Sequence, residues 1–445
     1  MNRETAEPSV DTLPGPKAEE RVAYHGEHAA TTTYVYDFVW DVTADAEGPF
    51  CTDADGNVLL DFTSHVGAAP LGYNNPDLLE RMAEFDLVDP LKIAGQDFYT
   101  TAGDPADVDF PGPAELMDRL ADASPDGLDT VFLSNSGAEA VENAIKVCYD
   151  DTKGQYGITF QGAFHGRTLG ALSLNRSKSV YRRDFPEIAG IHDAPFCDDR
   201  TCDPTTCSCG FFAGDTSQLR RMLDPKRGYV DAGEVAYLIM EPIQGEGGYR
   251  FPSASFMREV ADVCGTHDIP LVVDEIQSGL GRTGEFWASD GYPIEPDVIT
   301  AAKGLRVGAT IASGDTFPEE RSRLSSTWGA GDIVATMQGA ITVDLIREGG
   351  LMDNAVARGR QAVETLRDYD LPGVTDVRGK GLMLALDFAG TDLRDAVVDA
   401  ALARGLLTLG CGTRTLRLLP PLDVTAREIE LGCSILADAV RAAQN

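Results

Sequence analysis

Lysine and long apolar runs are scarce in this sequence. Only eight of its 445 residues are lysine, against 29 arginines and 71 acidic residues, and the formal net charge is −34. So acidic a chain repels the phosphates of nucleic acid, which argues against DNA and RNA as partners. The longest apolar stretches, such as residues 234–240, are far shorter than the roughly 20 residues that cross a bilayer. We therefore expect no membrane span and no nucleic-acid partner.

The N-terminus lacks the apolar core of a secretion signal, so we expect the protein in the cytoplasm. Its acidic residues are spread along the chain between regular apolar segments, which argues against disorder. Strong self-repulsion keeps a protein soluble and is a device of halophiles, so we expect a salt-rich cytoplasm. The composition indicates a habitat and leaves the activity open.

The order of the apolar segments predicts an α/β fold. With 445 residues, 43% of them hydrophobic, the chain is too long for one small core. From about residue 75, apolar strands alternate with helical patterns, which is typical of a large domain whose mainly parallel sheet is covered by helices. After about residue 335, amphipathic helices and short strands predict a smaller α+β domain. The strands expected in the large sheet are residues 129–134, 156–160, 234–241, 269–275 and 297–303.

We expect three segments along the chain. Residues 1–70 would supply an N-terminal arm and strands of the small domain, 71–330 the large domain, and 335–445 the C-terminal small α+β domain. Residues 1–30 carry Pro, Gly and charge without periodicity, so they would form a mobile or draped arm. Residues 50–62 fit two short strands around an Asp-Gly turn.

Four of the nine cysteines fall within thirteen residues: Cys197, Cys202, Cys207 and Cys209. Four thiols can hold zinc or an iron-sulfur centre. The spacing C-x4-C-x4-C-x-C matches no standard ligand pattern, however, and free thiols on a loop or a local disulfide are the alternatives. If a metal such as zinc is bound, we expect it to hold the insertion 196–212 in place and to take no part in the chemistry.

Carboxylates and a lysine stand where predicted strands of the large sheet end. Ligands of a parallel sheet bind beyond the carboxyl ends of its strands, and Asp274 stands at such an end, after the apolar run 270–273. Glu241 ends another strand and is followed by glycines that let a backbone approach closely. Lys303 ends a third, among small and apolar residues. A partly desolvated lysine forms imines with carbonyls, although an Asp274–Lys303 salt bridge is the competing interpretation.

Two further segments suit a flat, anionic ligand. Ser136, Gly137 and Ala138 follow a strand and open a helix, so their N–H groups suit a phosphate, although a simple helix cap has the same pattern. Phe164 and His165 follow another strand, where an aromatic face could stack on a flat ring or simply belong to the core. A phosphate cradle, a stacking aromatic, a carboxylate and a lysine are together the set that pyridoxal 5′-phosphate requires.

Two stretches carry a resemblance to a known family. The sequence LVVDEIQSGLGRTG (271–284), followed by AAKG (301–304), resembles the class III, or omega, aminotransferases, which have the type I fold of pyridoxal-phosphate enzymes. The likeness runs from about residue 35 to the C-terminus, with the motifs in the family's order. It implies a homodimer, or a higher oligomer, whose active sites lie at a subunit interface.

The resemblance also implies roles for the residues at the strand ends. Lys303 would hold the cofactor as an imine, and Asp274 would pair with its pyridine nitrogen. Gln277 would hydrogen-bond the ring hydroxyl, while Ile276 and Phe164 would pack on the two faces of the ring. The other residues expected around the cofactor are Ser136, His165 and Glu241.

Other segments would hold the phosphate and the substrate. Gly137 and Ala138 would bind the phosphate through their N–H groups, joined by Thr327 from a second subunit. Arg417 would bind a substrate carboxylate, for which its two-pronged guanidinium is suited, and Glu246 would neutralise Arg417 when another substrate is bound. Without the resemblance, a lone arginine before an apolar run, such as Arg417, is more often a residue of a surface strand.

By this resemblance the protein is an aminotransferase that moves an amino group from an amino acid or ω-amino compound to a 2-oxo acid, with 2-oxoglutarate as the expected acceptor. A racemase or epimerase of the same family is the alternative, and a non-catalytic scaffold is a third. The chain departs from the family's pattern at Ala138, where a hydroxyl residue is common, and in GLRVGAT (304–310) and GAGD (329–332). These departures leave the shape of the substrate pocket open.

Overall fold

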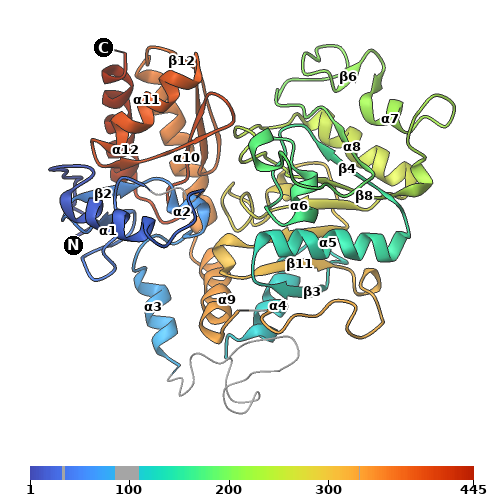
Figure 1. Ribbon diagram of the computed structural model, residues 1–445, viewed down its shortest axis with the longest axis horizontal. Helices are drawn as coiled ribbons and strands as arrows, with labels where there is room; N and C mark the ends of the chain where they lie inside the picture. The colour runs from blue at the N-terminus through green and yellow to red at the C-terminus, as the bar shows by residue number, and fades with distance from the viewer. Residues whose placement is uncertain (33–35, 86–109, 330, 445) are drawn as a thin grey trace. The chain divides into compact units, whose positions relative to one another are not determined.

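The computed structural model describes residues 1–32, 36–85, 110–329 and 331–444 (Figure 1). Within these ranges, no helix is both long enough and apolar enough to cross a membrane. The described residues fall into two compact units, which we call unit 1 and unit 2. Their bounds are Met1–Leu79 with Asp353–Asn445 for unit 1, and Glu80–Met352 for unit 2.

A seven-stranded sheet forms the centre of unit 2. In spatial order its strands are β3 (Thr130–Ser134), β11 (Gly308–Ala312), β10 (Val298–Ala301), β9 (Leu271–Asp274), β8 (Val235–Met240), β4 (Tyr156–Phe160) and β5 (Ile191–Ala194). The neighbours from β10 to β5 are parallel, whereas β11 is antiparallel to both β10 and β3. The α/β fold with a mainly parallel sheet is therefore confirmed.

Two strands of this sheet, β5 and β11, are not predicted by the apolar pattern. β5 lies at the edge of the sheet, and its sequence IHDA is only half-buried at three of four positions. β11 has the sequence GATIA, which lacks the large apolar side chains of the other central strands. Because β11 pairs with a strand on each side, tertiary pairing rather than local preference makes it a strand.

Helices cover both faces of the sheet (Figure 1). Along β8, Leu238 and Met240 pack on one face with α8 (Ala254–His267), whereas Ile239 packs on the other face with α5 (Gly137–Thr152). Burial on both faces explains why β8 and β9 are continuous apolar runs whose every residue is buried. The buried carboxylates Asp274 and Glu241 stand where β9 and β8 end.

The remaining elements of unit 2 connect or cover these strands. A small antiparallel sheet pairs β6 (Phe212–Ala213) with β7 (Thr216–Ser217). A single 3-10 turn, η4 (Lys303–Leu305), follows β10 directly. The other described elements of unit 2 are α4 (Pro113–Asp122), α6 (Leu169–Leu174), η1 (Ser179–Tyr181), α7 (Gln218–Met222), η2 (Ala232–Glu234), η3 (Ala288–Gly291), η5 (Gly314–Thr316) and α9 (Ile333–Glu348).

Unit 1 contains two small sheets, consistent with the α+β domain that the sequence predicts. One sheet joins β1 (Phe50–Thr52), β2 (Val58–Asp61) and β14 (Leu406–Leu407), and the other joins β12 (Val374–Lys380), β13 (Met383–Phe388), β16 (Thr415–Leu418) and β15 (Leu409–Cys411). β1 and β2 form the antiparallel pair expected around the Asp-Gly turn. The helices are α1 (Pro16–Gly26), α2 (Ser64–Gly67), α11 (Thr391–Leu402) and α12 (Ala426–Ala442), with α3 (Pro76–Ala83) and α10 (Leu351–Asp368) crossing the unit boundaries.

The N-terminal arm belongs to unit 1 and packs against its C-terminal segment. Arg3 Nη1 lies 2.7 Å from Asp423 Oδ2, and Arg3 Nε lies 2.7 Å from Glu428 Oε1. The arm also contains α1, which the sequence does not predict. Ala18 is the buried residue of this helix, so few of its positions need an apolar side chain. A helix with so little buried surface lacks the apolar periodicity that marks helices elsewhere in the chain.

Helix α9 packs against η4, the turn that begins at Lys303. The close approach depends on Gly339, because a Cβ atom at this position would lie 2.4 Å from the carbonyl oxygen of Leu305. By contrast, Gly265 in α8 has no atom within 4 Å of the place where its Cβ would stand. The contact between α9 and η4 therefore requires glycine at position 339, whereas position 265 has room for a larger side chain.

We predict opposite effects for the same substitution at these two positions. Gly339→Ala should lower the free energy of unfolding by about 1–3 kcal/mol, because a backbone carbonyl must move to make room. Gly265→Ala should raise it by up to about 1 kcal/mol, because alanine is the better helix former. Denaturant unfolding of both variants measures the difference. Equal stabilities would contradict the close contact between α9 and η4.

Candidate active site

The carboxyl end of β9 holds a buried acid. Asp274 is 4% exposed, and its Oδ2 lies 2.7 Å from Nδ1 of His165. Its Oδ1 accepts a hydrogen bond of 3.1 Å from the backbone N–H of Ile276. Two donors thus compensate the burial of this carboxylate, and an imidazole that donates through Nδ1 has a fixed tautomer. The structure therefore assigns His165 to Asp274, a pairing that the sequence does not predict.

Lys303 stands at the end of the neighbouring strand. β9 and β10 are parallel, and Asp274 lies opposite Thr300 in their pairing. Lys303 follows Thr300 by three residues. Lys303 is half-buried and has a φ of +41°, in the left-handed region that residues other than glycine seldom adopt. Backbone outliers of this kind concentrate at functional sites.

Asn175 holds the His165 segment in place. Its Oδ1 accepts the backbone N–H of His165 at 2.6 Å, and its Nδ2 donates to the carbonyl oxygen of Gly166 at 2.8 Å. Gly166 has a φ of +141°, and a Cβ atom there would lie 2.7 Å from Cβ of Ala138. The His165 segment and the start of α5 are therefore in close contact. Nothing in the sequence around Asn175 marks this role.

The start of α5 meets the turn that follows Asp274. Ser136 is the N-cap of this 16-residue helix, and its Oγ accepts the backbone N–H of Glu139 at 3.2 Å. A Cβ atom on Gly137 would lie 2.8 Å from Cδ1 of Ile276. The structure thus brings Gly137 and Ile276 together at a helix N-terminus, where the dipole and free N–H groups favour an anion.

A second buried carboxylate lies near Asp274. Glu241 accepts the backbone N–H of Phe164 at 3.0 Å and that of Gly245 at 2.8 Å. Burial raises the pKa of Glu241 to about 7, against the lowering effect of His165 and with a further rise from Asp274. This carboxyl group is therefore able to hold a proton near neutral pH.

Gln277 lies beside Glu241. A Cβ atom on Gly245 would be 2.5 Å from Gln277 Oε1 and 3.5 Å from Glu241 Oε2. Within the described part of the chain, Gln277 Oε1 is buried without a hydrogen-bond partner, and the same holds for His165 Nε2. Buried polar atoms normally find partners, so their presence at one strand edge indicates a place for a polar ligand.

Glu275, adjacent to Asp274 in the sequence, has a structural task. Its Oε2 accepts a hydrogen bond of 2.6 Å from the Ser278 hydroxyl, and its Oε1 accepts the backbone N–H of Ser289 at 2.7 Å. Its own N–H donates to the carbonyl oxygen of Thr300 on β10. Burial raises the pKa of Glu275. Of the two adjacent acids, the one paired with His165 is thus the candidate for chemistry.

Phe164 and Glu246, two residues of the expected site, belong to one cluster of side chains. The Phe164 ring meets the Tyr181 ring edge-on, with centroids 5.5 Å apart. Glu246 Oε1 lies 2.7 Å from Lys178 Nζ and 2.8 Å from the Tyr181 hydroxyl. Tyr181 therefore joins Phe164 to Glu246, and neither it nor Lys178 was expected in the site.

Arg417 and Thr327 lie elsewhere in the chain. Arg417 belongs to β16 of unit 1 and is 6% exposed, so the alternative of a surface strand residue is wrong. Thr327 is exposed on a loop of unit 2, next to Trp328, which is 55% exposed. Their expected contacts with substrate and with a second subunit's phosphate stay predictions.

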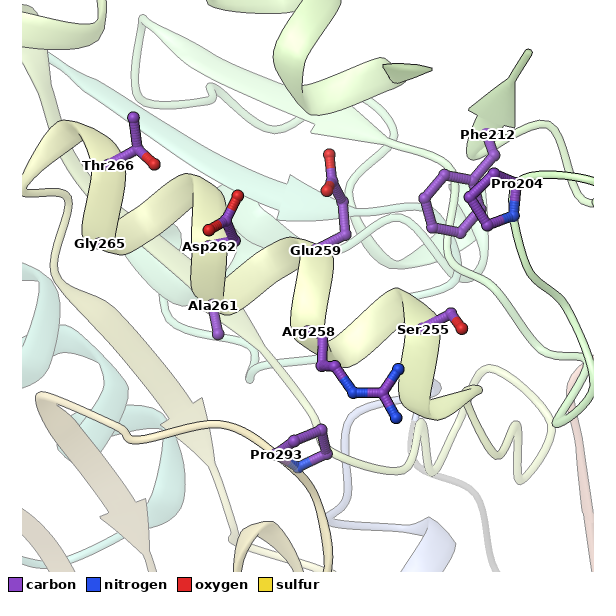
Figure 2. A pocket seen from close by; sticks show the side chains of 10 residues that line it. All are labelled: Pro204, Phe212, Ser255, Arg258, Glu259, Ala261, Asp262, Gly265, Thr266 and Pro293. Atoms are coloured by element: carbon purple, nitrogen blue, oxygen red, sulfur yellow. The ribbon is translucent and has the colours of Figure 1, made fainter. Parts of the chain in front are cut away.

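Two pockets of unit 2 lie away from these strand ends. One runs along α8 and is bordered by Pro204 and Phe212 (Figure 2). Another lies where β9 begins, around Leu271 and Asp297. Neither is lined by Asp274 or Lys303, so the chemistry of the side chains, rather than the size of a hollow, indicates the candidate site.

The comparison with protein families decides the assignment. The family model described as "Aminotransferase class-III" matches residues 36–440, nearly the whole chain. This chain belongs to the class III aminotransferases. The enzyme is accordingly a transaminase that depends on pyridoxal phosphate, as the strand-end residues indicate.

Relatives agree with this assignment. The aminotransferase is 33% identical to an acetylornithine aminotransferase of Methanopyrus kandleri, over 89% of this chain and 93% of that protein. It is 32% identical to an L-lysine-epsilon aminotransferase of Amycolatopsis lactamdurans, over 97% of each. The solved lysine aminotransferase from M. tuberculosis matches with a TM-score of 0.83 at 28% identity, over 97% of this chain and 100% of that chain. Nothing here supports the racemase alternative or a non-catalytic scaffold.

The residues at the strand ends fit pyridoxal 5′-phosphate. The phosphate suits the N-terminus of α5, where Gly137 leaves the backbone accessible. The pyridine nitrogen suits Asp274, and the ring hydroxyl suits the buried Oε1 of Gln277, which has no partner among the described residues. The phosphate, the pyridine nitrogen and the ring hydroxyl thus each have a complementary group in unit 2.

The raised pKa of Glu241 gives a prediction about stability. A folded-state pKa of about 7, above the usual value for Glu, means that the native state binds the proton more tightly than the unfolded state does. Stability therefore falls as pH rises towards about 7 and changes no further above it. Glu241→Gln removes the cost of ionising this buried carboxyl group. The free energy of unfolding of the variant, relative to that of the parent, should therefore rise with pH by up to about 3 kcal/mol.

Unfolding curves of both proteins between pH 5 and 8 measure this difference. Glu285→Gln removes one exposed charge and is the matched control. A difference between Glu241→Gln and the parent that stays constant with pH would show that the carboxyl group is ionised throughout the range.

Proposed function

We propose that this aminotransferase moves an amino group from an amino acid or ω-amino compound to a 2-oxo acid, with 2-oxoglutarate as the acceptor. The similarity to acetylornithine and L-lysine-epsilon aminotransferases supports such a donor. Both names denote amino acids that carry a nitrogen far from the carboxylate. A donor with a primary amine at one end and a carboxylate at the other is therefore our first candidate.

Several residues of unit 2 would hold the cofactor. Lys303 would bind it through its amine, and Gly137 and Ala138 would hold the phosphate through their N–H groups. Ile276 and Phe164 would contact the two faces of the ring. When bound, pyridoxal phosphate supplies an electron sink for the carbon that loses a proton.

The observation that carries the proposal is the buried Asp274–His165 pair, with an Nδ1–Oδ2 distance of 2.7 Å. A hydrogen bond to the ionised form stabilises the carboxylate, which can then hold a proton on the pyridine nitrogen. Once it is no longer bonded to the cofactor, the amine of Lys303 would be the base that takes the proton from the substrate carbon bearing nitrogen. Asp274 would thus keep the pyridine nitrogen protonated, whereas Lys303 would move the proton of the substrate.

A cationic side chain would bind the carboxylate of the substrate. Arg417 is buried on β16, and a guanidinium offers two parallel donors to a carboxylate. Glu246 is engaged by Lys178 and Tyr181, so it would need to exchange these partners to neutralise Arg417. We therefore assign carboxylate recognition to Arg417 and leave Glu246 as its counterpart for donors of other chemistry.

A homodimer, or a higher oligomer built from it, is part of the proposal. Thr327 is exposed next to Trp328, which is 55% exposed, so both side chains are accessible to another chain. Thr327 would then reach the phosphate bound by the partner. The net charge of −34 supports a salt-rich cytoplasm as the place of action.

A donor screen in molar potassium chloride tests the substrate class. N-acetylornithine, ornithine, lysine and 4-aminobutyrate are each supplied with 2-oxoglutarate, and glutamate is measured. We expect glutamate from at least one of these donors and none when the oxo acid is left out. Formation of a D-amino acid from a single L-amino acid without any acceptor would instead establish racemisation.

The choice of lysine has its own test. Lys303→Ala should lose both turnover and the visible absorption of lysine-held cofactor, because no other amine replaces it at this strand end. The exposed Lys226→Ala is the matched control and should keep both. Substantial turnover in Lys303→Ala would mean that another lysine holds the cofactor.

A further inference from the structure

The insertion after β5 gathers its cysteines in space. Cys197, Cys202 and Cys209 offer Sγ atoms that all lie within 4.8 Å of one another. Cys202 Sγ is 4.0 Å from Cys209 Sγ, and Cys207 Sγ is 3.4 Å from Cys209 Sγ. Three thiols from a thirteen-residue stretch thus lie within ligand distance of one another, and Cys207 adjoins this set through Cys209.

The separations between these sulfurs fit one metal ion. A tetrahedral ion with metal–sulfur bonds of about 2.3 Å places its four sulfurs about 3.8 Å apart. The Cys202–Cys209 and Cys207–Cys209 distances of 4.0 and 3.4 Å lie on either side of this value, and all pairs among Cys197, Cys202 and Cys209 are within 4.8 Å. A disulfide requires about 2.05 Å, and every cysteine in the structure is a free thiol. An iron-sulfur cluster would stand between its thiolates and push them further apart. We propose that Cys197, Cys202, Cys207 and Cys209 bind one structural zinc ion.

The surroundings of the four thiols suit such a site. Cys197 and Cys202 are buried and belong to the core cluster on the α8 face of the sheet, against which Cys207 and Cys209 also pack. The backbone N–H of Phe212 points at Cys207 Sγ, with an N–S distance of 3.3 Å. Backbone donors of this kind stabilise metal-bound thiolates, and burial on one side keeps water from the ion.

Zinc is the ion that this ligand set selects. Four thiolates in a tetrahedron are typical of zinc, which has no redox chemistry and leaves no coordination position open. Binding converts four thiols to thiolates and releases up to four protons to solvent, while no electron is transferred. The site is therefore closed and structural, and it is independent of the proposed substrate.

The insertion contacts the segment that follows Glu241. Arg200 lies over the Phe251 ring, 4.2 Å from its centroid, and Asp198 forms an ion pair of 3.7 Å with Arg250. Arg250 in turn exchanges two backbone hydrogen bonds of 3.2 Å with Gln244. Zinc would thus fix the base of the turn whose Gly245 N–H donates to Glu241.

Metal analysis of the full-length holoenzyme tests the proposal. After passage through a chelating resin, we expect about one zinc ion per chain, no acid-labile sulfide, and all nine thiols reactive once the protein is unfolded with a chelator. Cys197→Ser and Cys209→Ser should lose the zinc, whereas Cys264→Ala, a buried cysteine of α8, should keep it. The loss should also lower the midpoint of thermal unfolding.

Cobalt substitution keeps the test decisive if a serine variant fails to fold. Protein grown with Co²⁺ should show the intense visible bands of tetrahedral cobalt together with thiolate charge-transfer absorption. Absence of both metals, iron in place of zinc, or fewer than nine thiols because of a disulfide would each overturn the proposal. So would zinc that remains bound in both folded serine variants, because the ion would then lie elsewhere.

Discussion

A buried hydrogen bond between His165 and Asp274 is the interaction on which the chemistry of unit 2 depends. A carboxylate among apolar strands is costly unless donors surround it, and Asp274 receives one from the imidazole and one from the backbone of Ile276. Asn175 in turn fixes the backbone of His165. The negative charge can therefore stand at the end of β9, a strand in which every other residue is apolar and buried.

Three buried carboxylates close together have different tasks because they have different partners. Asp274 faces an imidazole, whereas Glu275 accepts from Ser278 and Ser289 and ties the end of β9 to its neighbours. Glu241 accepts only backbone N–H groups, and burial raises its pKa to about 7. The same chemical group thus serves as a fixed charge, a structural acceptor and a proton store.

The sequence predicts features whose signal is local or repeated, and it misses those that depend on contacts between distant segments. The apolar runs of β8, β9 and β10 mark a covered parallel sheet, and each ends at a residue of the candidate site. The pairing of His165 with Asp274 could not be predicted, because the two residues are 109 positions apart and nothing in either segment marks the other as its partner. The same reason hides Asn175. The four cysteines are recognisable as a group in the sequence, but only the folded loop shows that the sulfurs of Cys197, Cys202 and Cys209 lie within 4.8 Å of one another.

Unit 1 is built from both ends of the chain, and this affects how the protein is made. β2 pairs with β14, which comes more than three hundred residues later, and Arg3 bonds to Glu428 across 425 positions. A ribosome therefore releases the first 79 residues long before their partners exist. During most of translation the apolar face of β1 and β2 has no native cover, and unit 2 is the only part that can fold first. Unit 1 can be completed only after β14 and α12 have been made.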